Sequence, residues 1–225
     1  MPDFTKRKPF SIAAPTSLTE QVRQGSVDRR EHEKDALRAT IFRAAADLLV
    51  EQGYTAFSLR KLAARIGYSA TTIYRYFRDK DELVMAVMDE GFHAFGQQLH
   101  AAVYGATDPF DQLEALGRAY VRFGFASPMF YRVMFMQRCD VWEKLSDSEM
   151  HDKLGSYQLL VATLQRCIDT GRTRSTDAEA LSCTLWAHMH GIVSLGLTMP
   201  FLEPADVERM TDHSSAMMRQ GLITR

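Results

Sequence analysis

The stretch from residue 69 to residue 80 gathers small hydroxyl, tyrosine and basic side chains in a short segment of the chain. Tyrosine hydroxyls and Lys and Arg side chains suit phosphate oxygens, and small hydroxyls let a helix approach base edges closely. The same residue types occur on ordinary solvated helices, so it is their spacing around a glycine turn that favours contact with DNA. The residues predicted here for DNA contact are Ser69, Thr71, Thr72, Tyr74, Arg75, Tyr76 and Lys80.

Two short amphipathic helices joined by a glycine are expected to position these side chains. Gly67 ends the first helix, because glycine adopts the left-handed conformation that a sharp turn needs. The second helix is predicted over residues 70–77, with Ile73 and Phe77 directed inward and the polar side chains left outward. Helix, turn and helix in this order form the helix-turn-helix arrangement, whose second helix enters the major groove.

Helical periodicity also governs the rest of the chain. Apolar residues recur at spacings of three or four from Lys34 onward, and Gly53 is expected to end this helix. No stretch alternates with period two for long enough to predict a strand. The sequence therefore predicts an all-α protein of about nine helices, with an N-terminal three-helix helix-turn-helix domain and a larger helical domain. Helix starts are predicted at Ser58, Ser69, Asp79 with Glu82, Asp108 with Pro109, Ser127 with Pro128, Ser146 with Glu149, Thr176 with Glu179, and Pro204.

Charge divides unevenly along the chain, although the net charge is only −1. Residues 1–80 hold 15 Lys and Arg against 9 Asp and Glu, whereas residues 81–225 hold 12 against 19. A basic first third suggests a part that faces nucleic acid. Residues 1–33 carry prolines and several basic side chains and are predicted to form a flexible basic arm, whose later part, from Val27 to Glu33, is charged enough to extend the first helix. This arm either enters the minor groove or adds only non-specific attraction.

Several classes of protein are disfavoured. No apolar run is long enough to span a membrane, and the basic start is not followed by the apolar segment of a signal peptide, so a cytoplasmic protein is expected. Cys139, Cys167 and Cys183 are isolated and are interpreted as small buried hydrophobic residues. No Walker, GxGxxG or HExxH pattern occurs, and Ser58-x-x-Lys61 lacks the partner motifs of serine β-lactamases. We therefore expect no enzymatic activity, no cofactor and no metal site.

Residues 41–83 carry a pattern of apolar, glycine, serine and aromatic positions at fixed spacing. Its positions are Phe42, Ala45, Leu49, Gly53, Tyr54, Ser58, Leu59, Leu62, Ala63, Ile66, Gly67, Tyr68, Ser69, Thr72, Ile73, Tyr74, Tyr76, Phe77, Lys80 and Leu83. This pattern resembles the TetR family of bacterial transcriptional regulators. The resemblance implies an all-helical homodimer that usually represses transcription and leaves its operator when a small ligand enters the C-terminal domain. It also places Arg60 near the DNA.

The resemblance assigns roles within the second helix and just after it. It gives phosphate contacts to Tyr74, Tyr76 and Lys80, and groove-facing positions to Thr71 and Thr72. The partner that it implies is double-stranded operator DNA, and the protein is expected to bind it as a sequence-specific regulator. No membrane partner is expected.

The resemblance also divides the chain. The basic arm of residues 1–33 is followed by a DNA-binding domain over residues 34–82 and by a ligand-binding and dimerisation domain over residues 83–225. In this family the last two helices usually pair with their copies in a second subunit. Gly191 and Gly196 would permit such a close approach of helices, although a monomer's central helix is the alternative.

One segment of the larger domain is similar to a subgroup of the same family. Leu185-Trp186 followed by His190-Gly191-Ile192 is similar to the Trp and His-Gly signature of one class of these ligand-binding domains. That signature supports the same architecture and names no ligand.

The middle of the chain is rich in aromatic and methionine residues. Such residues at helical spacing are often simple core, but this much adaptable apolar surface also suits a pocket for a hydrophobic or aromatic small molecule. A C-terminal domain that only dimerises or binds protein, without a small-molecule ligand, is the alternative. His190 is either a pocket residue or a satisfied core histidine. The predicted pocket residues are Phe123, Phe130, Tyr131, Met134, Trp186 and His190.

Overall fold

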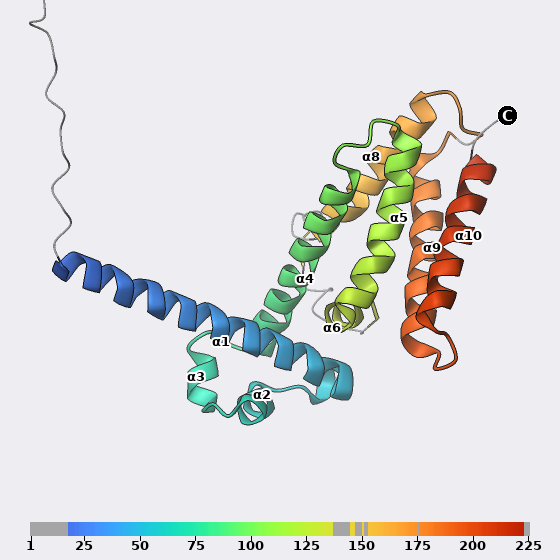
Figure 1. Ribbon diagram of the computed structural model, residues 1–225. Helices are drawn as coiled ribbons and strands as arrows, with labels where there is room; N and C mark the ends of the chain where they lie inside the picture. Colours follow the sequence, from blue (N-terminus) through green and yellow to red (C-terminus); the bar gives the residue numbers. More distant parts are fainter. Residues whose placement is uncertain (1–17, 137–144, 147–149, 151–152, 175, 223–225) are drawn as a thin grey trace, which may run out of the picture. The chain divides into compact units, whose positions relative to one another are not determined.

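The computed structural model describes residues 18–136, 145–146, 150, 153–174 and 176–222. Their regular structure consists of nine α-helices and one π-helical turn, without a β-strand, which confirms the predicted all-α class. The chain forms two compact units, residues 1–40 and residues 41–225. In chain order the elements are α1 (Leu18–Ala56), α2 (Leu59–Ile66), α3 (Ala70–Tyr74), α4 (Lys80–Val103), α5 (Pro109–Ala126), α6 (Pro128–Tyr131), the π-helical turn η1 (Arg132–Met136), α8 (Gly155–Asp169), α9 (Ala178–Thr198) and α10 (Pro204–Leu222) (Figure 1).

Helix α1 begins earlier than the sequence pattern predicts. It starts at Leu18, so residues 27–33, whose charge favoured an extension of the first helix, are helical, and residues 18–26, which were expected in the flexible arm, are helical as well. This segment contains many Glu, Gln and Arg residues with good intrinsic helix propensity, and no proline interrupts it. Residues 32–36 are all exposed, so this part of α1 is a solvated helix without an apolar stripe. The rest of the arm, residues 1–17, lies outside the described residues.

The helix-turn-helix segment folds around apolar side chains that come from four helices. Ile41 of α1, Leu62 of α2 and Ile73 of α3 are completely buried, as is Leu83 of α4. Phe77, just before α4, packs against an α1 ring and is almost fully buried. The apolar residues predicted to face inward therefore lie in one core that these helices share.

Two glycines shape this segment as predicted. Gly67 has a φ of 73° in the left-handed region and ends α2, and its backbone N–H donates to carbonyls of the last turn. Gly53 has a φ of 72° and interrupts the regular helical geometry inside α1, after which the chain makes one more helical turn. A residue with a Cβ would be strained at either position, so both glycines are required by backbone conformation.

Most of the predicted helix starts are found, with one correction. The side chains of Ser58, Ser69, Asp79 and Asp108 each accept a backbone N–H at the start of their helices. Helix α9 is capped by Asp177, whose carboxylate accepts the N–H of Ala180, and not by Thr176 as predicted. A carboxylate suits the positive end of the helix dipole better than a hydroxyl does.

The remaining starts have mixed outcomes. Pro128 begins α6, but Ser127 makes no side-chain capping bond there. Pro204 is the first residue of α10, as predicted. The predicted capping pair Ser146 and Glu149 cannot be judged as a pair, because Glu149 lies outside the described residues.

Helices α4, α5, α8, α9 and α10 form a bundle in which α5 contacts each of the other four. Small residues allow close packing within it. A Cβ added at Gly196 of α9 would lie 2.5 Å from Cζ of Phe125 in α5, so this glycine lets α9 and α5 of the same chain pack closely. A Cβ added at Gly191 would meet no atom of the described residues within 4 Å. The two glycines that were predicted to act alike therefore differ in their surroundings.

The cysteines also differ from each other. Cys167 is buried, as predicted, whereas Cys183 is exposed and its Sγ lies 3.0 Å from Oη of Tyr157. Cys139 lies outside the described residues.

Candidate DNA-binding surface and ligand pocket

The predicted DNA-contacting side chains form a mostly exposed set around α3. Tyr74 and Tyr76 are 49% and 37% exposed, which is high for large aromatic residues in a folded domain. Thr72 and Lys80 are half-buried. The exposed members of the set are Arg60, Ser69, Thr71, Tyr74, Arg75 and Tyr76. Because Ile73 is completely buried on the opposite side, α3 presents a fixed face.

Helix α3 is shorter than predicted. It ends at Tyr74, with Arg75 as its C-terminal cap, so Tyr76 and Phe77 lie in the turn that follows. The backbone N–H of Phe77 still donates to the carbonyl of Ile73, which keeps this turn in continuity with the helix. The apolar spacing predicts the buried positions correctly, but it does not mark where the helical backbone stops.

Two of the predicted contact residues already have local partners. Oγ of Ser69 accepts the N–H of Thr72 at 3.1 Å and lies 2.8 Å from the Thr72 hydroxyl. The ammonium of Lys80 donates to the carbonyl of Tyr54 at 3.2 Å and lies 4.0 Å from the centroid of its ring. Tyr54 in turn donates to Asp81. These contacts hold Lys80 at the N-terminus of α4, where the helix dipole also favours an anion.

The basic side chains of this segment fall into two groups. Arg65 is paired with Glu51 at 2.6 Å, and Arg78 is paired with Glu82 at 3.0 Å. These ion pairs lower the pKa of Glu51 through the hydrogen bond from Arg65, and they raise the pKa of both arginines. Within the described part of the chain no carboxylate pairs with Arg60 or Arg75, which remain exposed. Lys61 and Lys80 likewise bond to amide or backbone carbonyl oxygens and to no carboxylate among the described residues.

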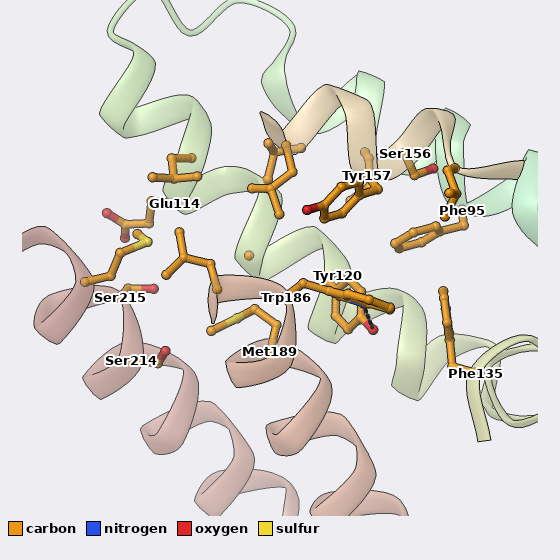
Figure 2. Close-up of a pocket in the computed structure, with 18 of the residues that line it drawn as sticks. Phe95, Glu114, Tyr120, Phe135, Ser156, Tyr157, Trp186, Met189, Ser214 and Ser215 are labelled. Atoms are coloured by element: carbon orange, nitrogen blue, oxygen red, sulfur yellow. Dashed lines mark hydrogen bonds between the residues drawn. The ribbon is translucent and has the colours of Figure 1, made fainter. Parts of the chain in front are cut away.

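An apolar cavity lies inside the C-terminal bundle and has a volume of about 90 Å³. Its lining comes from α4, α5, α8, α9 and α10, together with η1 (Figure 2). The lining is dominated by aromatic and aliphatic side chains, with few polar groups, which is the usual character of a small-molecule site. Lining residues include Phe95, Leu99, Leu116, Phe135, Leu160, Leu185, Trp186 and Met189.

Four polar rings form a hydrogen-bonded chain along one side of this cavity. Nε1 of Trp186 donates to Oη of Tyr120 at 3.1 Å, and Oη of Tyr120 lies 3.0 Å from Oη of Tyr131. Oη of Tyr131 lies 2.7 Å from Nδ1 of His190. Trp186 can only donate, so Tyr120 accepts its N–H. In the neutral tautomer whose Nδ1 carries no proton, Nδ1 accepts from Tyr131 at 2.7 Å, and Oη of Tyr120 lies 3.3 Å from the same nitrogen.

Burial supports this arrangement of protons. It raises the pKa of Tyr120 to about 12 and the pKa of Tyr131 well above its usual value, so both hydroxyls keep their protons. Burial also lowers the pKa of His190, which keeps the imidazole neutral and able to accept. The hydrogen bonds and the burial of His190 are therefore those expected for the second interpretation, a core histidine whose hydrogen bonds are satisfied.

Only one of the six predicted pocket residues lines the cavity, namely Trp186. Phe123, Tyr131 and Met134 are buried in the core beside it, and Phe130 packs against that core. His190 reaches the cavity wall through its bonds with the two tyrosines. The prediction selected the aromatic-rich middle of the chain, whereas the cavity is walled largely by α4, α5 and α8–α10.

Sequence reasoning missed the polar end of the cavity. Glu114 of α5 and Ser214 and Ser215 of α10 line it. The Glu114 carboxylate is held by Arg118 at 3.1 Å and by Arg219 at 3.2 Å. A buried pair of serines in an amphipathic helix gives no signal in a single sequence, because serine is common on such helices.

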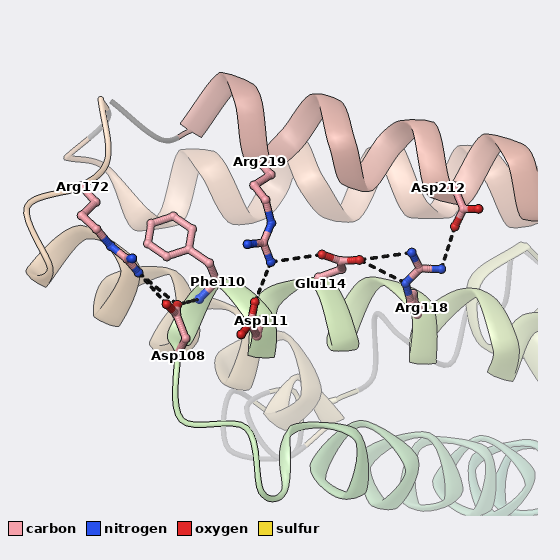
Figure 3. A network of polar contacts seen from close by, with 8 residues as sticks. All are labelled: Asp108, Phe110, Asp111, Glu114, Arg118, Arg172, Asp212 and Arg219. Carbon is pink, nitrogen blue, oxygen red and sulfur yellow. Dashed lines mark hydrogen bonds and ion pairs between the residues drawn. The ribbon is translucent and has the colours of Figure 1, made fainter. Parts of the chain in front are cut away.

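Ion pairs extend from Glu114 along the seam between α5 and α10 (Figure 3). Arg219 also binds Asp111 at 2.6 Å, and Arg118 also binds Asp212 at 2.7 Å. At the start of α5, Arg172 pairs with the capping residue Asp108 at 2.9 Å and lies over the ring of Phe110. The hydrogen bond from Arg172 lowers the pKa of Asp108. The remaining pairs in this network are Arg118 with Glu114 and Arg219 with Glu114.

Two negative findings concern the described residues only. None of their helices is long and apolar enough to cross a bilayer. Within the same part of the chain, no three His, Cys, Asp or Glu side chains come together in a group that could hold a metal ion.

The sequence matches known families over both parts of the chain. Residues 41–87 match the bacterial regulatory proteins of the tetR family, and residues 113–218 match the tetracyclin repressor-like C-terminal domain. The chain belongs to the tetR family of bacterial regulatory proteins.

A curated relative supports the same class. The HTH-type transcriptional activator FasR of Mycolicibacterium smegmatis is 28% identical over 102 residues, which make up 45% of this chain. The chain spans about half, 47%, of the length of that relative.

Solved structures share the fold at low sequence identity. A tetR-family regulatory protein from Rhodococcus RHA1 has a TM-score of 0.68 and 20% identity, covering 80% of this chain and 95% of its own. The fatty acid degradation regulator FadR from Bacillus halodurans has a TM-score of 0.68 and 18% identity, with coverages of 80% and 93%. The ketosteroid transcriptional regulator KstR2 of Mycobacterium tuberculosis has a TM-score of 0.68 and 18% identity, with coverages of 84% and 98%.

Proposed function

We propose that the protein binds operator DNA through α3 and represses transcription until a small apolar ligand enters the cavity of the C-terminal bundle. The observation that carries the DNA-binding part is the exposed polar face of α3, fixed from behind by the buried Ile73. The apolar cavity, to which helices far apart in the sequence contribute, supports the sensing part.

The proposed DNA contacts divide into two kinds. Tyr74, Tyr76 and Lys80 contact phosphates, which set affinity and register, while Thr71 and Thr72 face the base edges. Arg60 and Arg75 add phosphate contacts with their free guanidinium groups. Ser69 contributes mainly by capping α3, since its hydroxyl accepts the N–H of Thr72.

The proposed assembly is a homodimer through α9 and α10. Apolar side chains of these helices and of their connection are exposed in the single chain, including Leu195 at 43%, Phe201 at 72% and Met217 at 63%. The open space around Gly191 leaves room for a helix of a second copy. A dimer places two recognition helices on half-sites about one DNA turn, roughly 34 Å, apart.

Helix α4 links the two proposed sites. Lys80 is its first residue, and Phe95 and Leu99 from its second half line the cavity. A ligand that prefers one position of α4 therefore changes the placement of the recognition helices in the dimer. The effect on DNA binding is limited by the difference in ligand affinity between the two states.

The test uses the full-length protein in three steps. Operator sequences are selected from a random DNA pool, single-ring aromatic and alkyl compounds are screened by thermal shift, and the compounds that raise the melting temperature are added to the DNA complex. Selection of a palindromic site and its release by a stabilising compound are the expected results.

Other outcomes separate the alternatives. If no compound raises the melting temperature while DNA binding is intact, the C-terminal domain is a dimerisation or protein-interaction module without a small-molecule ligand. If no DNA sequence is enriched, the α3 assignment fails.

A further inference from the structure

Ser214 of α10 is a buried hydroxyl without a partner. Its side chain is only 3% exposed and lines the cavity, and Oγ has no hydrogen-bond partner among the described residues. Other buried hydroxyls of the bundle bond back to their own helix, as Ser182 does to the carbonyl of Ala178 at 2.7 Å and Thr211 does to that of Val207 at 2.8 Å. An unpaired buried hydroxyl weakens the folded state, so its presence at a cavity wall points to a ligand group.

Ser214 lies at a distinct end of the cavity. Figure 2 shows Ser214, Ser215 and Glu114 together on one side, apart from the aromatic rings of Phe95 and Phe135. The ion pairs between α5 and α10 hold this end in place (Figure 3). The cavity therefore has an aromatic end and a polar end built on α5 and α10.

Several other polar groups of the cavity lining already have hydrogen-bond or ion-pair partners. These groups are therefore less available to a ligand. The Tyr157 hydroxyl lies 3.0 Å from Sγ of Cys183, and Lys153 is paired with Asp89. Tyr120 accepts from Trp186 and is bonded to a second tyrosine. The Ser214 hydroxyl differs from them because both its proton and its lone pairs are free.

We propose that the effector is an apolar molecule with one uncharged hydroxyl or carbonyl group, and that this group pairs with Oγ of Ser214. The inference rests on the proposed ligand-sensing function. A carboxylate is disfavoured, because Glu114 lies at the same end and the cations next to it, Arg118 and Arg219, already bind carboxylates. An ammonium is disfavoured as well, since both oxygens of Glu114 already accept from these arginines.

The volume of the cavity limits the size of the ligand that it can hold. Its volume of about 90 Å³ compares with an apolar cavity of about 150 Å³ that binds benzene. Met189 and Met218 line the cavity, and methionine side chains adjust readily to a ligand. The cavity is thus smaller than one that holds benzene, so the proposed ligand, a single ring with a short polar arm toward α10, requires Met189 and Met218 to move aside when it binds.

The experiment titrates the full-length protein with four matched probes by calorimetry: ethylbenzene, 2-phenylethanol, phenylacetate and 2-phenylethylamine. The key variant is Ser214→Ala, which removes only the free hydroxyl at a helical position that alanine suits. It is expected to weaken 2-phenylethanol binding by about 3- to 10-fold and to change ethylbenzene binding by less than about twofold. Phenylacetate and 2-phenylethylamine are expected to bind more weakly than 2-phenylethanol.

A matched control and a stability measurement complete the design. Ser182→Ala removes a buried hydroxyl that is satisfied within α9 and lies outside the cavity lining, so it should leave the binding of all four probes unchanged. The melting temperature of Ser214→Ala without ligand should equal or exceed that of the original protein, because an unpaired buried group is lost.

The outcomes distinguish the inference from the function on which it rests. If Ser214→Ala changes both neutral probes equally or changes neither, or if a charged probe binds best, the assignment of Ser214 is overturned while the cavity remains a ligand site. If neither ethylbenzene nor 2-phenylethanol binds the original protein, the ligand-sensing proposal fails and the inference fails with it.

Discussion

The helix-turn-helix segment and the C-terminal cavity are built from the chain in opposite ways. The side chains proposed to contact DNA follow one another closely, from Arg60 to Lys80, and their geometry depends on local caps and on glycines such as Gly67. The cavity lining comes from residues between Phe92 and Met218, and no short segment contains it. The comparison teaches that a site made by local structure can be read from spacing, whereas a site made by helix packing cannot.

The largest expected effect comes from breaking the core beneath the recognition helix. Phe77→Ala removes a ring that is 7% exposed and packs against Phe42 at a centroid distance of 6.1 Å. We expect the free energy of unfolding of this segment to fall by about 3–5 kcal/mol, measured by denaturant titration followed by circular dichroism. Arg75→Ala, an exposed change on the same segment, is the control and should cause little loss. Equal effects of the two variants would contradict the proposed core.

A second prediction concerns the phosphate contacts. The double variant Tyr74→Ala with Lys80→Ala should reduce the slope of log affinity against log salt by about 1.8, because the proposed dimer loses two Lys80 contacts and each neutralised phosphate contributes about 0.9, whereas the uncharged Tyr74 adds affinity without changing the slope. Relative to 1 M salt, this change in slope corresponds to a loss of about 30-fold in operator affinity near 0.15 M salt. The measurement is a binding titration at several salt concentrations.

The control for this prediction is an equivalent pair of changes elsewhere. Tyr104→Ala with Arg122→Ala also removes an exposed tyrosine and an exposed cation, but from the C-terminal bundle. It should leave the slope unchanged. Because Lys80 also contacts Tyr54, a thermal melt must show that the first double variant is folded. A folded double variant with an unaltered slope would refute the assignment.

A third prediction tests the hydrogen-bonded rings beside the cavity. Tyr131→Phe removes the hydroxyl that lies 2.7 Å from Nδ1 of His190, so this nitrogen keeps only the longer contact of 3.3 Å with Oη of Tyr120. We expect a loss of about 1–3 kcal/mol in stability, with DNA binding per folded molecule unchanged. Tyr157→Phe, in which the lost hydroxyl contacts only the outer Cys183 and the backbone of Glu179, should cost less. A reversed order would mean that the rings are not coupled as described.

The smallest effect is a dependence of stability on pH. Burial lowers the pKa of His190 in the folded state, so the unfolded chain takes up its proton first as the pH falls. The stabilising contribution is complete above the ordinary histidine pKa near 6.5 and is lost as the pH falls toward the lower folded value. Melting temperatures measured between pH 7.5 and 5.5 should decline, and His190→Asn should decline less steeply. An equal decline in both proteins would exclude this histidine as the source.

Much of the fold follows from the sequence, and the physical reasons are visible in particular residues. Ser58, Gly67 and Asp79 act locally, so their types predict where helices start and end. The helical stretch of α1 over residues 18–26 was missed because its sequence has no apolar stripe, and helix propensity alone gives a weak signal. Asp177 and Thr176 are adjacent possible caps, and spacing does not choose between them.

The cavity was the harder part to predict. The aromatic residues of the middle segment were natural candidates, but Tyr131 and Phe123 are buried core, whereas Phe95 and Leu99 line the cavity. Both kinds of position are apolar with helical spacing, so the sequence does not distinguish a side chain that fills a core from one that borders an empty space. Which of them borders a cavity depends on how several helices meet.

The ion pairs along α5 and α10 have a consequence for how specificity can change. Exposed ion pairs add little stability individually, but Arg118 and Arg219 each hold two carboxylates and so fix the register of the two helices from outside. Inward positions such as Ser214 and Ser215 can then be exchanged without moving this frame. If the cavity binds the proposed ligand, the seam makes its specificity evolvable, because one or two substitutions at the cavity wall can change the ligand while the helices keep their positions.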